Sequence, residues 1–323
     1  MTPREHFKTL VRCTTPHGYE EHVYGLLMRE IGAKKLDGMN YYLTVGGNSQ
    51  VVFTSHLDTA KFQGSLKIPQ SIVSLEYADL MYTDGKTNLG ADDRAGMAIM
   101  LHMIEQQIPG TYVFFIGEEC GCVGSSHAAR QGMLTDASVI ISFDRGGYND
   151  VITHQMSTRT CSDAFGKALA SELSRHGLAY QVSDRGSYTD SYEFSEIIPE
   201  CTNISVGYEF AHTVHEQQCL AHLDALGLAL CSLNFASIPV ERDPTIDDWD
   251  YGYDWKKWRW EKPFLPAQEK LDFSRFVSWL AGEIEDEILD EIAMHLEDSN
   301  LLEDGEGLID FYDEFVLWYQ DAL

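Results

Sequence analysis

The sequence predicts an α/β protein, a three-layer sandwich with a mostly parallel central sheet and helices on both faces. Three short runs of β-branched and aromatic residues lack polar alternation, which is typical of strands covered on both faces; they occupy residues 51–55, 112–116 and 139–143. A fourth run spans residues 203–207 and stops a few residues before His212. Helical stretches lie between these runs, and such alternation favours parallel strands with helices packed on either side.

Two of the helices can be placed from their own signals. Residues 94–106 carry apolar side chains at helical spacing, and they follow the first predicted strand of the sheet. A second helix is expected over residues 163–176, because Asp163 is a favourable N-cap and Gly177 is a favourable residue just past a helix end.

The composition changes near residue 243. Residues 243–323 contain 23 acidic and 6 basic residues, and they begin with an aromatic, acidic, linker-like stretch. Beyond it, apolar residues recur at helical spacing over 276–292, and 308–323 resembles a further short helix. We therefore expect a main domain, residues 1–242, followed by an acidic linker and helical extension, residues 243–323. The extension is expected to pack on the main domain or on a second subunit. The second arrangement would make the protein a homo-oligomer.

Composition excludes several classes of partner. The net charge of −28 argues against nucleic acid, whose binding depends on Lys and Arg. No apolar stretch approaches the roughly 20 residues that a membrane span needs, and the first six residues lack the features of a signal peptide.

Seven scattered cysteines fit reduced thiols in a cytoplasmic protein. Because no second Cys pair accompanies Cys120 and Cys122, we expect them to pack near the site without binding zinc.

Residues able to bind metal ions follow the predicted strands. His56, Glu118 with Glu119, and Asp144 each come directly after a strand, and His212 lies a few residues after the fourth run. In a parallel sheet the carboxyl ends of the strands meet at one edge, where ligands bind. These side chains, together with Asp92, are therefore expected to converge.

That inventory suits a pair of divalent cations. Two zinc ions about 3.5–4 Å apart can activate water and stabilise an oxyanion. Holding them takes a bridging carboxylate, one carboxylate and one imidazole for each ion, and a free carboxylate as general base. We assign Asp92 as the bridge, His56 and Asp144 to the first ion, Glu119 and His212 to the second, Glu118 as the base, and Asp58 as the group that holds His56. Adjacent glutamates can divide these roles because successive side chains of extended backbone point in opposite directions. The expected cofactors are two Zn²⁺, with Co²⁺ or Mn²⁺ as alternatives on the same ligands.

The same segments carry a family resemblance. The motifs are TSHLDT at 54–59, LGADDRAG at 89–96, GEE at 117–119 and FD at 143–144, preceded by TPHGYE at 15–20. They resemble the metal-binding motifs of the co-catalytic di-zinc exopeptidases, the superfamily of bacterial zinc aminopeptidases and peptidase T, over residues from about 10 to 235. The resemblance implies the residue roles given above and a cis peptide bond between Asp92 and Asp93, a costly geometry that marks functional sites.

Two departures from the family pattern narrow the prediction. Only 68 residues separate Asp144 from His212, too few for the inserted dimerisation domain of peptidase T, which favours a single-domain aminopeptidase-like arrangement. The segment between His56 and Asp92 is longer than in the simplest aminopeptidases, and residues 75–83 are expected to form a hairpin there as a wall of the site.

The last metal ligand and the substrate contacts are less constrained. His212 is preferred to His215 because the family places its ligand four residues before an acid, here Glu216. We expect Asp190, Tyr208 and Arg145 to contact the substrate. A terminal amine would need a spare carboxylate, with Glu209 as a candidate, and a terminal carboxylate would need an arginine, either Arg145 or Arg159.

The function predicted from these features is metal-dependent hydrolysis of peptide bonds by an aminopeptidase acting on a peptide with a free N-terminus. Two alternatives stay open. The protein could hydrolyse an N-acyl amino acid or another small amide with the same fold, or it could be a non-catalytic binding module that retains the scaffold. A panel of aminoacyl and N-acyl substrates separates the first two, and the intact base Glu118 argues against the third.

Overall fold

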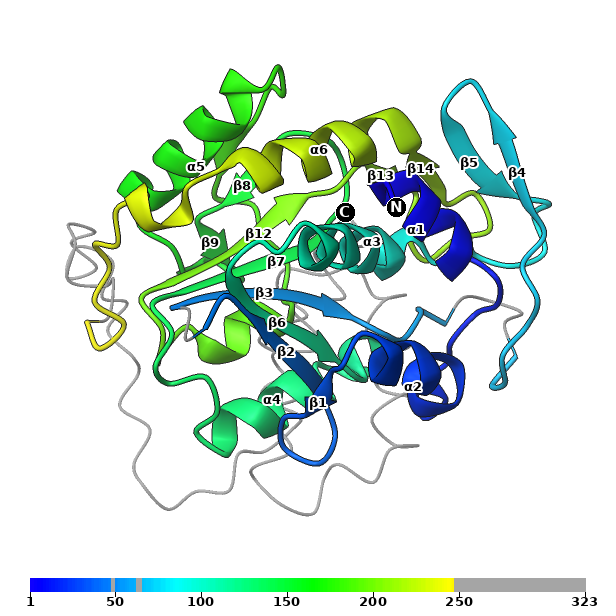
Figure 1. Ribbon diagram of the computed structural model, residues 1–323, viewed down its shortest axis with the longest axis horizontal. Helices are drawn as coiled ribbons and strands as arrows, with labels where there is room; N and C mark the ends of the chain where they lie inside the picture. Colours follow the sequence, from blue (N-terminus) through cyan, green and yellow to red (C-terminus); the bar gives the residue numbers. More distant parts are fainter. Residues whose placement is uncertain (48–49, 62–65, 247–323) are drawn as a thin grey trace, which may run out of the picture. The chain divides into compact units, whose positions relative to one another are not determined.

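The structure is a computed structural model, and it describes residues 1–47, 50–61 and 66–246. These residues form one eight-stranded sheet between two layers of helices, as predicted (Figure 1). Most of the predicted C-terminal extension, including the helices expected at 276–292 and 308–323, lies outside the described residues, so the domain boundary near 243 stays a prediction.

The central sheet is mixed and mostly parallel. Its strands lie in the order β1 (Lys34–Lys35), β2 (Tyr41–Val45), β6 (Gly110–Phe115), β3 (Val51–His56), β7 (Val139–Arg145), β12 (Glu200–Ser205), β8 (Asp150–Ile152) and β11 (Gln181–Ser183). The four inner strands β6, β3, β7 and β12 run parallel to one another, whereas β2 and β8 join this group antiparallel. The four predicted runs fall in these four inner strands, although β12 begins three residues earlier and ends two residues earlier than the predicted fourth run; their carboxyl ends share one edge of the sheet.

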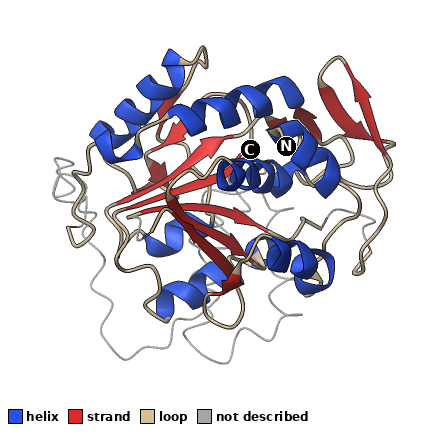
Figure 2. Ribbon diagram, in the orientation of Figure 1, coloured by secondary structure: helices blue, strands red, loops and turns tan. Residues whose placement is uncertain are grey.

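Helices cover both faces (Figure 2). On one face lie α1 (Pro3–Leu10), α3 (Ala91–Glu105), α5 (Asp163–Arg175) and α6 (Leu220–Ser232), and α2 (Glu20–Glu30) adds Tyr24 and Met28 to the same core. On the other face, α4 (Val123–Arg130) and the 3₁₀ turn η2 (Asp190–Phe194) enclose a smaller core that includes Val113, Phe115 and Phe194. Burying both faces removes the inner strands almost completely from water, which explains the apolar runs in β3, β6 and β7.

Helix α5 agrees closely with the helix predicted over residues 163–176. Its end is as predicted, since Gly177 has a left-handed φ of +83° directly after the cap residue His176. Its start differs by one residue, because Ser162 is the N-cap and its hydroxyl accepts the backbone N–H of Phe165. Asp163 instead occupies the first helical turn, where an acidic side chain suits the positive end of the helix dipole.

A second, four-stranded sheet stands beside the main one. It contains β13 (Tyr208–Glu209), β14 (Gln217–Cys219), β5 (Leu80–Thr83) and β4 (Ser74–Tyr77), in that order. The hairpin predicted over 75–83 is β4 and β5, joined by Ala78 and Asp79, which both have positive φ. Because β5 pairs with β14, the hairpin is attached to the loop that carries His212.

The remaining elements are short. They are β9 (His154–Gln155), β10 (Thr158–Arg159), and the 3₁₀ turns η1 (Glu118–Cys120) and η3 (Phe235–Ser237). All seven cysteines are unpaired, as expected from their spacing. Within the described part of the chain no helix has the length and apolar character needed to cross a membrane.

Candidate metal centre

The side chains predicted as metal ligands come together at the carboxyl ends of the inner strands. His56 is the last residue of β3, Asp144 lies near the end of β7, and Glu119 follows β6 by four residues. Asp92 lies at the start of α3, and His212 lies in the loop between β13 and β14. Five segments that are distant in the sequence therefore deliver carboxylates and imidazoles to one place.

Asp92 is at the centre of this cluster. Its Oδ1 lies 2.8 Å from Nε2 of His56, and its Oδ2 lies 3.2 Å from Nε2 of His212. Asp144 Oδ1 lies 3.5 Å from the same His56 nitrogen, and Glu119 Oε1 lies 3.2 Å from the same His212 nitrogen. Two groups result, each with its ligand atoms within 4.8 Å of one another: His56, Asp92 and Asp144 in one, and Asp92, Glu119 and His212 in the other.

The donor atoms fit divalent cations better than they fit one another. The buried Oε1 of Glu119 has no hydrogen-bond partner although the imidazole nitrogen of His212 is only 3.2 Å away. These two atoms belong to one group of potential ligand atoms that lie within 4.8 Å of one another. Imidazole nitrogen and carboxylate oxygen are the ligands expected for zinc, cobalt or manganese. Among the described residues, every candidate group of this kind consists of histidine and acidic side chains, with no cysteine.

His56 is oriented by its neighbour Asp58. The ring Nδ1 lies 3.1 Å from the backbone oxygen of Asp58, which favours a proton on Nδ1 and leaves Nε2 free toward Asp92 and Asp144. The Asp58 carboxylate, completely buried, accepts the backbone N–H of Glu118 at 3.0 Å and that of Glu119 at 3.2 Å. Asp58 thus connects an imidazole to the turn that carries the two glutamates.

The local structure at Glu118 and Glu119 differs from the prediction. We expected an extended strand end, but β6 stops at Phe115 and the two glutamates belong to the 3₁₀ turn η1. Gly117 makes the change of direction possible, because it adopts a left-handed φ of +66° before the turn. The physical reason for the turn is the Asp58 carboxylate, which gathers two consecutive N–H groups that an extended backbone would point in opposite directions.

Electrostatics at the centre reflect a surplus of buried carboxylates. Burial, followed by the charge of Asp144, raises the pKa of Glu118 well above its usual range, and burial followed by Asp92 raises the pKa of Glu119 to about 7. Burial works against ionisation of Asp92 too, but the histidines on its two oxygens outweigh that effect and lower its pKa. The carboxylates of Asp92 and Glu119, which face its ring nitrogen, raise the pKa of His212 to about 11. The site favours positive charge.

Several supporting residues were not predicted. Asn203, inside β12, accepts the backbone N–H of Asp144 at 3.0 Å and donates to its carbonyl at 2.8 Å. The hydroxyl of Thr189 donates to Asp144 Oδ2 at 2.6 Å. Asp93 accepts the backbone N–H of His56 at 3.1 Å. A polar side chain in a strand that is buried along its whole length, as at Asn203, is the signal that could have revealed this role.

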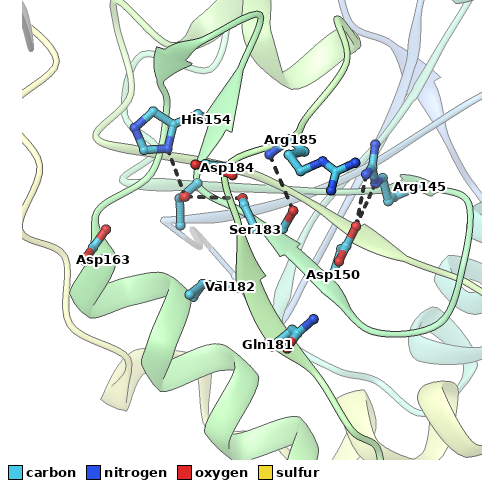
Figure 3. Close-up of a pocket in the computed structure, with 10 residues that line it drawn as sticks. Arg145, Asp150, His154, Asp163, Gln181, Val182, Ser183, Asp184 and Arg185 are labelled. Atoms are coloured by element: carbon cyan, nitrogen blue, oxygen red, sulfur yellow. Dashed lines mark hydrogen bonds and ion pairs between the residues drawn. The ribbon is translucent and has the colours of Figure 1, made fainter.

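The predicted substrate contacts divide into two groups. Tyr208 lies at the centre, with its hydroxyl 3.5 Å from Asp144 Oδ1. Asp190 is buried near Asp144, its Oδ1 has no hydrogen-bond partner, and burial raises its pKa to about 8. Arg145 does not join them: its guanidinium donates to Asp150 at 2.9 Å inside a separate polar cavity of about 800 Å³ along β8 and β11 (Figure 3).

The other candidates also have partners elsewhere. Glu209 accepts hydrogen bonds from Tyr148 and Gln217, and Arg159 pairs with Asp163 at 2.8 Å on the surface. His215 lines a different cavity of about 550 Å³ together with Phe210 and other residues of the hairpin side. Of the two histidines in this loop, His212 is therefore the one beside Asp92. The peptide bond between Asp92 and Asp93 is cis, as the resemblance implied.

Comparison with known proteins agrees with this fold and with this cluster of potential metal ligands. Residues 36–197 match Peptidase family M28, and the chain belongs to this family, which is metal-dependent. The match includes four of the five proposed ligands and ends before His212.

A curated relative shows how far sequence similarity extends. The uncharacterized protein YqjE of Bacillus subtilis (strain 168) is 29% identical over 186 residues, covering 50% of this chain and 48% of that protein. The chain therefore spans about half the length of the curated relative that it matches.

Solved structures share the fold at low sequence identity. A tripeptidase from Staphylococcus aureus subsp. aureus Mu50 aligns with a TM-score of 0.59 at 17% identity, and the aminopeptidase PepT from Bacillus cereus ATCC 10987 with 0.57 at 16%. Each alignment covers 71% of this chain and 96% of the other. The TET1 peptidase of Pyrococcus horikoshii aligns with 0.53 at 16% identity, over 72% of this chain and all of that one.

Proposed function

We propose that this protein is a metallo-exopeptidase, an aminopeptidase that hydrolyses peptides with a free N-terminus using two divalent cations, zinc being the first expectation. The observation that carries the proposal is the carboxylate of Asp92, whose two oxygens face two different imidazoles. One imidazole is enough for a carboxylate in a structural salt bridge. A carboxylate that bridges two ions must instead present each of its oxygens to a different cation. His56 with Asp144, and Glu119 with His212, would complete the two positions.

The chemistry follows from the residues around that pair. Two bound cations would polarise a substrate carbonyl and make water a better nucleophile at neutral pH. Glu118 is not needed as a ligand, so its carboxylate can take the proton from the attacking water and pass it to the leaving amine nitrogen. Asp58 holds the glutamate turn through its two backbone N–H groups.

The choice of an aminopeptidase rests on the neighbours and on the buried acids. Solved structures of the same fold are described as aminopeptidases and as a tripeptidase. Asp190 and Tyr208 lie where they could orient the end of a peptide, and both are polar groups in a largely buried setting. Arg145, held by Asp150, is not free at the centre to bind a terminal carboxylate, which favours recognition of the amino end.

The test combines elemental analysis with a substrate panel. We expect about two zinc, cobalt or manganese ions per purified full-length chain, hydrolysis of aminoacyl substrates, and loss of that activity with a chelator. Activity only toward N-acyl amino acids would replace the proposal by the amide-hydrolase alternative. Two bound ions without hydrolysis of either substrate class would indicate a binding module.

A general-base variant separates chemistry from metal binding. Glu118→Ala should lower kcat by at least about 10²-fold, because general-base catalysis contributes that much or more, while the metal content stays near two ions per chain. Glu196→Ala, which removes an exposed acid from the segment after η2, is the matched control and should leave kcat unchanged. Full activity in Glu118→Ala would refute the assigned base.

A further inference from the structure

Two buried side chains of opposite charge hold the turn that precedes Asp92. From one side, Nη1 of Arg94 donates to the carbonyl oxygens of Leu89 at 3.3 Å and Gly90 at 3.0 Å. From the other, the carboxylate of Glu216 accepts the backbone N–H of Gly90 at 2.6 Å and that of Asp92 at 3.0 Å. The carbonyl groups of this turn are therefore bound by a cation and its amide groups by an anion.

Both charges are fixed in the core. Glu216 is 0% exposed and Arg94 is 1% exposed. Arg94 also donates from Nε to the hydroxyl of Tyr24 at 2.8 Å, so its guanidinium cannot turn away without leaving buried donors unpaired. The turn has no freedom either, since Gly90 has a left-handed φ of +65° and an added Cβ would lie 1.6 Å from Nη1 of Arg94.

Glu216 links this turn to the second imidazole. It lies four residues after His212, directly before β14, and it bonds a backbone amide 124 positions earlier in the chain. His212 Nε2 faces Asp92 Oδ2 at 3.2 Å. A carboxyl group that accepts two backbone N–H groups is held in one orientation, so the segment of His212 is tied to the segment of Asp92 through Glu216.

We propose that Glu216 is a positioning residue that presets the distance between Asp92 and His212 and thereby sets the affinity for the cation that these two would share, without contacting it. The proposal rests on the proposed function, because it concerns the same pair of cations. Groups that orient metal ligands from behind change metal affinity by about 10–100-fold when they are replaced. Glu216 affects two proposed ligands at once, because it bonds the backbone N–H of Asp92 and lies in the loop that carries His212.

The variant Glu216→Gln tests it. Glutamine has the same length, but its amide nitrogen would face one of the two backbone N–H groups, so one bond is lost and two donors oppose each other. The metal-free full-length protein is titrated with Zn²⁺ in competition with a chromophoric chelator, which gives the two dissociation constants. We expect at least one of them to rise by about 10–100-fold.

Glu200 offers a matched control. It is also 0% exposed and also accepts backbone N–H groups, from Ser162 at 2.6 Å and Glu241 at 2.8 Å, but it lies at the start of β12, and its partners are not proposed ligands. Glu200→Gln should destabilise the fold to a similar degree while leaving both zinc dissociation constants unchanged.

The outcomes distinguish the inference from the proposed function. Zinc affinity unchanged in Glu216→Gln, or weakened equally in Glu200→Gln, overturns the positioning role while the two-ion site stands. Failure of the unsubstituted protein to bind two ions overturns the proposed function itself. If Glu216→Gln does not fold, Glu216→Asp serves instead, since it keeps the charge but is too short to reach both amides, and the same rise in a dissociation constant is expected.

Discussion

At the scale of single residues, the candidate metal centre depends on buried acidic side chains that each bond to two partners. Asp92 divides its oxygens between two imidazoles, and Asp58 divides its carboxylate between two backbone amides while its carbonyl holds His56. Each of these buried acids would be costly alone, because an unpaired buried charge is strongly disfavoured. Their cost is offset only when every oxygen has a donor or a cation, so the members of the cluster depend on one another.

Replacing Asp92 by Ala removes the proposed bridge. We expect elemental analysis of Asp92→Ala to show loss of both ions, because each proposed position loses a ligand, whereas Glu119→Ala should lose mainly one. Asp136→Ala, at an exposed position, controls for removal of a negative charge. Two ions per chain retained in Asp92→Ala would show that this carboxylate does not bridge.

At the scale of secondary structure, the sequence predicted the elements that are specified by their own residues. Strands β3, β6 and β7 are largely apolar runs because both of their faces are buried, and that requirement is visible in the residues themselves. Strands of two or three residues, such as β8, β11, β13 and β14, were not predicted, because their pairing partners decide them and little in their own composition does.

The candidate site divides along the same line. The ligand residues could be proposed because strand ends converge in any parallel sheet. The turn at Glu118 could not, because it depends on a carboxylate 60 residues earlier in the chain. The same holds for Glu216, whose two hydrogen bonds join segments that only the folded chain brings together.

Helix α6 gives a test of pH dependence. His222, in its first turn, lies against the rings of Tyr148 and Tyr180, and burial lowers its pKa to about 4. The unfolded chain takes up this proton below about pH 6.5, but the folded chain does not until about pH 4. The contribution of His222 to stability is therefore complete above pH 6.5 and is lost as the pH falls from 6.5 to 4.

We expect the free energy of unfolding to fall in that window by up to about 1.4 kcal/mol per pH unit on account of this group. Denaturant unfolding at several pH values should show a shallower decline for His222→Gln than for the unsubstituted protein. His176→Gln, at the exposed end of α5, controls for loss of an imidazole. Parallel curves for His222→Gln and the unsubstituted protein would exclude the effect.

At the scale of the whole molecule, charge is the dominant property. The chain carries 51 acidic and 23 basic residues, and part of that excess is buried at one edge of the sheet. Buried carboxylates that face one another repel, and bound cations would relieve this repulsion in the folded state only. Metal binding should therefore contribute to folding stability as well as to chemistry.

Removal of metal is expected to lower the melting temperature. A ligand present at 100 times its dissociation constant stabilises the native state by about 2.7 kcal/mol, which corresponds to a shift of roughly 5–10 °C for a domain of this size. Differential scanning calorimetry with and without chelator measures the shift. Glu118→Ala, which keeps the ligands, should show the same shift, and Asp92→Ala should show almost none. A chelator without effect on the unsubstituted protein would contradict the argument.

The two imidazoles differ in how they are supported. His56 ends an inner strand and is 1% exposed, whereas the side chain of His212 is 53% exposed and its loop is anchored through β14 to the β4–β5 hairpin. Movement of that hairpin would displace His212 and leave His56 in place. The two bound ions would then exchange at different rates. An ion on the His56 side would stay bound, whereas an ion on the His212 side would bind last and dissociate first.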